Sequence, residues 1–359
     1  MSSQDIAISG SGDMIGVESH WICTANHGFA PYAQEELRRL FGAVKSTVVM
    51  PGEVLRVKLQ EPAERVIDAI STQPPVFLRH IFHIDWEWNG LEQDEFTKGM
   101  EKLAEFALSD PQLRNAARIA VQPRKSEHSL WSGSVSELKD LIQSKLSGLS
   151  ADFVVRDAEY ILSVFVGKEF IYAGVSRPSD NISDWNGGAV RFQREEGQIS
   201  RAKFKLLEAE LVFGINFAAF REALDIGAAP GGWTSFLLER GLSVTAVDPA
   251  KMHPSLLNAL NLTILRKNAG EVKLREHQFD LLVCDMSWSP KLTAKLVSEL
   301  LYALAPGGTA IVTVKLLSKK PMALIQEVIG TFQESRLQVQ RAKQLFHNRD
   351  EITLYMIKY

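Results

Sequence analysis

A glycine-rich turn at residues 225–233, which reads Asp-Ile-Gly-Ala-Ala-Pro-Gly-Gly-Trp, constrains the fold of this chain more than any other feature. The apolar run 221–226 is typical of a buried strand, and the residues from Trp233 onward indicate a helix. This geometry lets a backbone approach a nucleotide-like ligand closely. The turn lacks the Gly-x-Gly-x-x-Gly spacing of dinucleotide sites, and no phosphate-binding lysine follows. We therefore expect a ligand without phosphates, and S-adenosylmethionine is the common one.

Strand-like runs alternate with helix-like stretches through the rest of the second half. This alternation predicts the α/β class, with a doubly wound, Rossmann-like sheet. Ligands of such sheets bind beyond the carboxyl ends of the strands. The glycine turn and four polar residues fall at these ends: Gly227, Asp248, Asn268, Asp285 and Lys315. The remaining strands are expected at 242–247, 262–265, 279–284, 309–314 and 351–359. Helices are expected at 291–304 and 321–334, and the first of them is expected to end at Pro306-Gly307-Gly308.

Asp248 closes the second of these strands, about twenty residues beyond the turn, where an acidic residue can bind both ribose hydroxyls of an adenosine. The alternative is an ordinary strand-end aspartate in a turn before Pro249. We favour ribose binding, because Asp248 ends a βαβ unit that already contains the glycine turn.

Lys315 ends an apolar strand and is a candidate general base. Its alternative role is an ordinary lysine that extends into solvent. A lysine base needs its pKa lowered from about 10.4 to about 7–8, which burial and a second cation can achieve. Lys205, on a helix before the first strand, could supply that cation, Asp285 could orient the base, and Glu351 could complete the set. Two lysines and two carboxylates can be buried together only if all are paired.

These four residues resemble the Lys-Asp-Lys-Glu catalytic tetrad of the FtsJ-like RNA ribose 2′-O-methyltransferases, in the same order and at comparable spacing. Cys284-Asp285-Met286 and the segment 343–353 are similar to the bacterial members that modify a cytidine of 23S ribosomal RNA. The resemblance implies S-adenosylmethionine-dependent methylation of a ribose 2′-hydroxyl, with Lys315 as proton acceptor. It implies large-subunit ribosomal RNA, or its precursor, as the partner.

The resemblance also implies a set of methyl-donor contacts, to which the turn and the strand ends add others. Asn268 stands where the resembled proteins have an aspartate near the adenine, and an asparagine can still hydrogen-bond an amino group. The expected donor contacts are Ser200, Asp225, Gly227, Ala229, Pro230, Gly231, Gly232, Trp233, Asp248, Asn268 and Asp285.

The first half of the chain is expected to form two smaller α+β units. A βαββαβ pattern over 18–89, ending in a strand at 76–86, predicts a ferredoxin-like domain. Residues 90–180 form a second unit, in which Ser134 and Glu137 make a capping box that opens a helix; resemblance suggests a THUMP RNA-binding domain. Residues 1–17 are expected to be a disordered leader without the features of a signal peptide, 181–199 a linker, and 200–359 the methyltransferase domain.

Charge and composition limit the kinds of partner and ligand that this chain is expected to bind. The formal net charge of −3 argues against a generally basic coat protein, yet local clusters of basic residues favour an RNA path past the site. Two cysteines supply neither a disulfide framework nor a zinc set, and no apolar run reaches membrane-spanning length. We expect a cytoplasmic monomer that needs no metal. The basic clusters are Arg114, Arg118, Arg124 and Lys125; Arg336, Arg341, Lys343 and Arg349; and Arg191, Arg194, Arg201, Lys203 and Lys205.

Three other functions compete with this hypothesis. A base methyltransferase would place an Asn-Pro-Pro-Tyr-like motif or a cysteine nucleophile after the fourth strand, where this chain has Asp-Met-Ser-Trp-Ser-Pro at 285–290. A non-catalytic RNA-binding or ribosome-assembly protein is disfavoured because all four tetrad positions are filled. A nicotinamide oxidoreductase would need the glycine spacing that the turn lacks.

Overall fold

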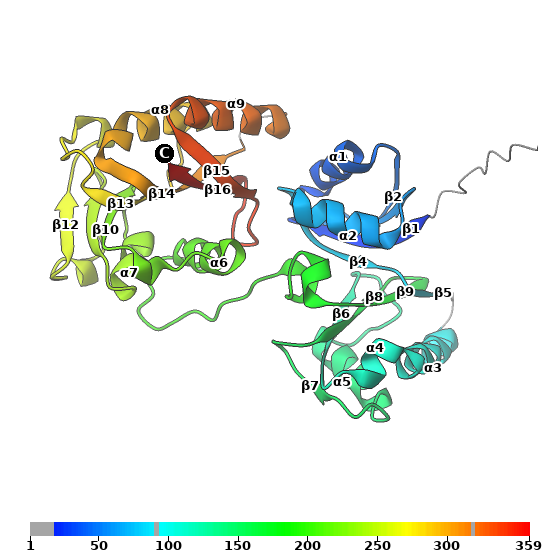
Figure 1. Cartoon of the computed structure of the whole chain (residues 1–359). Helices are drawn as coiled ribbons and strands as arrows, with labels where there is room; N and C mark the ends of the chain where they lie inside the picture. The colour runs from blue at the N-terminus through cyan, green and yellow to red at the C-terminus, as the bar shows by residue number, and fades with distance from the viewer. Residues whose placement is uncertain (1–17, 90–92, 317–319) are drawn as a thin grey trace, which may run out of the picture.

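The structure is a computed structural model that describes residues 18–89, 93–316 and 320–359. Its described strands form a four-stranded, a five-stranded and a seven-stranded sheet. The two smaller sheets come from the first half of the chain, and the seven-stranded sheet comes from the second half (Figure 1). No described helix is long and apolar enough to cross a membrane.

The seven-stranded sheet has the doubly wound, Rossmann-like arrangement that the sequence predicts. Its strand order is β12-β11-β10-β13-β14-β16-β15, and the neighbours from β12 to β14 are parallel. From β10 the chain adds strands β11 and β12 on one side, and from β13 it adds strands on the other side. The carboxyl ends of β10 and β13 therefore flank the crevice in which such sheets usually bind their ligand. The strands are β10 (Glu222–Ile226), β11 (Ser243–Val247), β12 (Leu262–Leu265), β13 (Phe279–Cys284), β14 (Leu304–Lys315), β15 (Leu337–Lys343) and β16 (Glu351–Lys358).

Helices cover both faces of this sheet because successive strand residues point to opposite sides. In β10, Ala223 packs in the cluster of α6 (Lys203–Phe213) and α7 (Gly232–Glu239). Its neighbour Leu224 packs in the cluster of α8 (Pro290–Leu300) and α9 (Pro321–Glu334). Both faces of the central strands are therefore buried, which explains their continuous apolar sequence.

Two local expectations about this sheet are wrong. Pro306-Gly307-Gly308 does not end a helix but lies within β14, which begins at Leu304, next to a register shift against β13. The strand β15 was not anticipated: it is an edge strand with many polar residues, and its pairing with β16 fixes it in place.

The four-stranded sheet follows the expected βαββαβ order, and its strands are arranged β2-β3-β1-β4. The expected strand 76–86 is two strands, because the second part leaves this sheet and pairs with β9 (Phe170–Ser176) of the next one. We call residues 18–83 the first unit. Its elements are β1 (Ser19–Ala25), α1 (Ala30–Phe41), β2 (Val44–Met50), β3 (Val54–Leu59), α2 (Ala63–Thr72) and β4 (Leu78–His83).

The five-stranded sheet has the order β5-β9-β8-β6-β7. The capping box of α5 is confirmed: Ser134 Oγ accepts from Glu137 N, and Glu137 Oε2 accepts from Ser134 N. The assignment of this unit as a THUMP domain, and the domain boundaries, stay predictions. Its elements are β5 (Trp86–Asn89), α3 (Gln93–Ser109), α4 (Pro111–Asn115), β6 (Arg118–Lys125), α5 (Val135–Lys145), β7 (Asp152–Phe153), β8 (Tyr160–Val166) and β9 (Phe170–Ser176).

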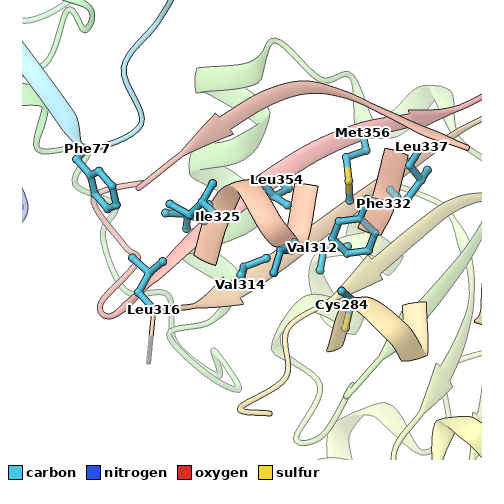
Figure 2. Close-up of a cluster of buried hydrophobic side chains, with 14 of the residues drawn as sticks. Phe77, Cys284, Val312, Val314, Leu316, Ile325, Phe332, Leu337, Leu354 and Met356 are labelled. Carbon is cyan, nitrogen blue, oxygen red and sulfur yellow. The ribbon is translucent and has the colours of Figure 1, made fainter. Parts of the chain in front are cut away.

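The first unit and the seven-stranded unit share one hydrophobic cluster. Figure 2 shows this cluster, which extends from Phe332 and Met356 within the seven-stranded unit to Phe77 of the first unit, near Leu316 and Ile325. Phe77 is fully buried. The end of β14, where Lys315 stands, is thus packed against the N-terminal half of the chain.

Candidate active site

The glycine turn lies at the carboxyl end of β10 and is closely packed by three loops. Gly227 has φ +75° and Gly231 has φ +115°, a left-handed region that favours glycine. A Cβ atom on Gly227 would lie 2.5 Å from the Met286 side chain, and one on Gly231 would lie 2.2 Å from Leu256. The turn therefore requires glycine for its backbone angle and for its close neighbours.

Ser200 lies over the start of α7. A Cβ atom on Gly232 would lie only 2.3 Å from Ser200 Oγ, and this oxygen accepts a hydrogen bond from Ala202 N. Ala229 is half-buried and Pro230 is exposed on the turn. The structure thus brings Ser200 together with the turn, as the expected donor site requires.

Asp248, at the end of β11, is tied to the turn. Its Oδ2 atom accepts from Ala229 N at 3.1 Å, and its Oδ1 atom accepts from Ala250 N at 2.7 Å. A carboxylate oxygen accepts more than one hydrogen bond, so these contacts leave capacity for ribose hydroxyls. Asn268 is exposed, and its amide donates to Glu271 Oε1 at 3.1 Å.

Two residues expected to contact the donor lie behind the turn instead. Asp225 is 1% exposed, and its carboxylate accepts from Thr234 Oγ1 at 2.6 Å. Burial raises the pKa of Asp225 to about 7, aided by the charges of Asp285 and Asp248. Trp233 is 3% exposed and its indole N–H donates to Ala202 O. Both residues support the turn, because β10 and α7 direct their side chains inward.

The four tetrad residues meet in one hydrogen-bonded network. Lys205 Nζ lies 2.8 Å from Asp285 Oδ2 and 2.9 Å from Glu351 Oε1. Lys315 Nζ lies 2.7 Å from Glu351 Oε2. The antiparallel pairing of β14 and β16 places Lys315 and Glu351 opposite each other. Glu351, rather than Asp285, is therefore the carboxylate that contacts the expected base.

The network is largely removed from water. Glu351 has 3% of its side chain exposed, against 21% for Lys315. Burial acts to lower the pKa of Lys205, but Asp285 and Glu351 outweigh it, and the net pKa is raised. Burial likewise acts to raise the pKa of Glu351, and the two lysines outweigh it and lower that pKa. Both residues are held in their charged forms.

Thr313 is a member of this network that the sequence analysis missed. Its hydroxyl donates to Asp285 Oδ1 at 2.7 Å, and the residue is fully buried. Thr313 precedes Lys315 by two residues on β14, so both side chains leave the strand on the same face. That spacing was the available signal, since a polar residue in a buried apolar strand needs a partner.

Cysteine and histidine take no part in this site. Cys23 and Cys284 are free thiols inside the core. His80 is buried, and His83 bonds to Asp85 Oδ1 at 2.6 Å. Among the described residues, no group of three or more His, Cys, Asp or Glu residues could hold a metal ion.

Each expected basic cluster contains a member whose charge is paired with a carboxylate or buried. Arg124 pairs with Glu53 at 2.8 Å. Lys343 is buried and donates to the carbonyl oxygens of Pro75 and Leu78. Lys203 is buried and pairs with two glutamates. Closeness in the sequence therefore does not make every member of a cluster accessible, because burial and tertiary pairing occupy some of them.

A hollow of about 500 Å³ nevertheless gathers positive charge where the first unit meets β6, α5 and the segment 184–191. Arg156 stacks over Trp185, with its Cζ atom 3.4 Å from the ring centroid, and Phe346 also lines the hollow. Glu53 and Asp184 are the acidic lining residues. The basic lining residues are Arg79, Arg124, Lys125, Lys139, Arg156 and Arg191.

The sequence of this chain is similar to a methyltransferase family and to several known proteins. Residues 198–346 match the sequence model of the family described as FtsJ-like methyltransferase. The ribosomal RNA large subunit methyltransferase M of Psychromonas ingrahamii is 35% identical over 203 residues, which cover 54% of this chain and 55% of that protein. The protein of the same name from Laribacter hongkongensis is 30% identical over 248 residues, 66% of this chain and 69% of that protein. Such matches span between about half and two thirds of the relatives' length.

Among solved structures, TrmN from Thermus thermophilus aligns with 95% of this chain and 100% of its own, at 16% identity and a TM-score of 0.40.

Proposed function

We propose that this chain, which belongs to the family of the ribosomal RNA large subunit methyltransferase M, transfers a methyl group from S-adenosylmethionine to a ribose 2′-oxygen of RNA. The observation that carries this proposal is the paired network of Lys205, Asp285, Lys315 and Glu351. Asp285 follows β13, the strand beside β10, so the network lies next to the glycine turn. A donor site and a proton-accepting site therefore share one edge of the sheet.

The residues at the turn fit a methyl donor that has no phosphate groups. Asp248 would bind the ribose hydroxyls, and the backbone from Gly227 to Gly232 would face the rest of the donor, with Ser200 beside it. Asn268 would hydrogen-bond the adenine, and Asp285 would contact the donor at the border with the tetrad. When bound, the donor supplies an electrophilic methyl group on a sulfonium sulfur.

Lys315 is the proposed general base. Lys205 contacts two carboxylates, which hold its pKa high and keep it charged. Among the described residues, Lys315 contacts one carboxylate, that of Glu351, and its side chain is 21% exposed against 13% for Lys205, so it is the lysine that can reach a substrate. Its Nζ atom would accept the proton of the 2′-hydroxyl as the C–O bond forms and the S–C bond of the donor breaks. Alignment of the reacting atoms provides most of the rate enhancement in such a displacement.

The proposed substrate is large-subunit ribosomal RNA, and within it a cytidine of the 23S molecule. The family membership supports this substrate class, and the basic hollow beside Trp185 supports an RNA path. Arginine and aromatic side chains together bind phosphates and stack bases of single-stranded RNA. Phe346 lines that hollow and belongs to the segment that leads into Glu351, so one segment connects the hollow with the proposed reaction site.

The test is transfer of tritium from labelled S-adenosylmethionine to large-subunit ribosomal RNA from cells that lack this protein, followed by nucleoside analysis. We expect label in 2′-O-methylcytidine. Label on a base would replace this proposal by a base methyltransferase. Donor binding without transfer to free RNA or to assembly intermediates, or no donor binding, would favour a non-catalytic RNA-binding protein.

A further inference from the structure

The segment 344–350 connects β15 to β16 and ends directly before Glu351. Leu316 N donates to Asp350 O at 2.7 Å, so the segment is also joined to the residue that follows Lys315. The segment is therefore directly connected, through the chain and through this bond, to both members of the Lys315–Glu351 pair.

The first unit holds this segment from one side through Asn26, which follows β1. Its Nδ2 atom donates to Leu345 O at 2.8 Å and to Asn348 O at 3.1 Å. Arg79 Nη1 donates to Asn26 Oδ1 at 2.8 Å, which fixes the orientation of the amide. Asn26 is 7% exposed, so these bonds are shielded from competing water.

Backbone contacts strengthen this attachment. Gln344 N donates to Val76 O at 2.9 Å, across the border between the two units. On the other side of the segment, Glu208 accepts from Phe346 N at 2.7 Å and from His347 N at 2.9 Å. Glu208 lies three residues after Lys205 on α6, so the helix that carries one tetrad lysine is bonded to the segment that carries Glu351.

We infer that Asn26 is a positioning residue for methyl transfer: the first unit holds the segment 344–350, and thereby Glu351, in the geometry of the tetrad. Asn26 itself touches no tetrad residue in this structure, and its role is to satisfy two carbonyl oxygens of the segment. The first unit is thus part of the apparatus that orders the reaction site. This inference rests on the proposed function.

The test uses the full chain with Asn26→Ala and Asn26→Asp. The aspartate has the shape of asparagine and keeps the contact with Arg79, but it cannot donate to the two carbonyl oxygens when ionised. We expect kcat to fall roughly 10- to 100-fold in both variants, because small misplacements of reacting groups have effects of this size. The KM for the donor and the affinity for RNA should stay within about twofold of wild type.

Asn181→Ala is the matched control. Asn181, at the start of the expected linker, is another asparagine that is 1% exposed, and its side-chain amide has no partner among the described residues. Its loss removes a buried amide without touching the segment, so kcat should be unchanged. Amide hydrogen exchange provides a readout that does not need activity: exchange within 344–350 and at Leu316 should accelerate in both Asn26 variants and not in the control.

Three outcomes would overturn the inference. Unchanged exchange in the segment would show that Asn26 does not hold it. Faster exchange with wild-type kcat would show that the segment does not position the tetrad. A loss confined to RNA affinity would make Asn26 a substrate contact. If wild-type protein shows no methyl transfer, the proposed function fails, and the exchange data alone decide whether Asn26 holds the segment. If Asn26→Ala does not fold, Asn26→Asp carries the test.

Discussion

Individual side chains divide into those that face the reaction site and those that support it. Lys205, Lys315 and Glu351 form a largely buried chain of contacts, in which each carboxylate oxygen of Glu351 contacts a different lysine. Asp225 looks equivalent in the sequence but lies beneath the turn, bonded to Thr234. We therefore expect substitutions of the side chains that face the reaction site to change turnover, and substitutions of the supporting side chains to change stability.

Replacing the proposed base should abolish turnover while leaving binding intact. Lys315→Ala removes the proton acceptor, and general-base catalysis contributes roughly 10²- to 10⁴-fold. We expect kcat to fall by that factor in the tritium-transfer assay, with donor and RNA dissociation constants near those of wild type. Lys295→Ala, at an exposed position of α8, is the control and should keep full activity. Turnover within twofold of wild type in Lys315→Ala would exclude this lysine as the base.

Asp225→Asn should stabilise the protein at neutral and alkaline pH. The native pKa of Asp225 is about 7, against an unfolded value of 3.8, so the native state retains its proton longer. Wild-type stability therefore falls as the pH rises from about 4 to about 7, by roughly 4 kcal/mol at most from this group. The asparagine has no proton to lose and can still accept from Thr234.

Denaturant titrations at several pH values test this prediction. The stability difference between variant and wild type should grow up to about pH 7 and then stay constant. Glu208 also has a native pKa of about 7 and adds its own pH dependence, but it is present in both proteins and cancels in the difference. A difference that does not vary with pH would show that Asp225 is charged in the native state at all these pH values.

At the scale of elements, the glycine turn and the β13 loop form one packed unit. Gly227 contacts Met286, the residue after Asp285, so the donor turn and the tetrad share a border. This close approach links the strand-turn-helix motif directly to the strand-end residue Asp285.

Gly227→Ala should therefore affect both stability and donor binding. The new methyl group would lie 2.5 Å from Met286 at a backbone angle of φ +75°. We expect a loss of stability of about 1–3 kcal/mol and a weaker donor affinity by isothermal titration. Gly270→Ala is the control, because an added Cβ there meets nothing within 4 Å and φ is ordinary. Equal effects of the two substitutions would contradict the close packing of the turn.

At the scale of the whole molecule, the N-terminal half both packs against the reaction site and offers a basic surface. The shared core at Phe77 and the contacts of Asn26 attach the first unit to the end of β14 and to the segment before β16. The basic hollow lies where the first unit meets β6, α5 and the segment 184–191, and Phe346 of the segment before β16 also lines it. RNA binding and tetrad geometry are therefore both expected to depend on how these units are joined.

Charge reversal in the hollow should weaken RNA binding with little effect on donor binding. Lys139 and Arg191 line the hollow, and no ion pair of either is among those of the described residues. In the double variant Lys139→Glu, Arg191→Glu, the slope of log affinity against log salt should decrease by about 0.7 for each lost phosphate contact. Fluorescence anisotropy with an RNA fragment measures both quantities. Lys295→Glu, on α8, is the matched surface control; an equal loss in it would indicate a nonspecific charge effect.

Local patterns in the sequence were enough to predict most of the seven-stranded sheet and the positions of its functional strand ends. Apolar runs and turns are local signals, and in a doubly wound sheet the carboxyl ends of neighbouring strands lie together. This is why Asp248, Asp285 and Lys315 could be assigned to one edge, and why Glu351 could be added through the family resemblance. Ferredoxin-like topology and the THUMP assignment remain predictions about the first half.

The contacts between these side chains depend on how distant parts of the chain pack together. Glu351, rather than Asp285, contacts Lys315 because β16 runs antiparallel to β14 in one particular register. Lys343 can be buried because its ammonium group donates hydrogen bonds to carbonyl oxygens of the first unit. These partners lie more than two hundred residues away, so no local sequence pattern indicates them. The hydrogen bonds of Asn26 to the segment before Glu351 could not be predicted for the same reason. Sequence periodicity indicates which face of an element is buried, whereas hydrogen-bond partners depend on how separate units pack.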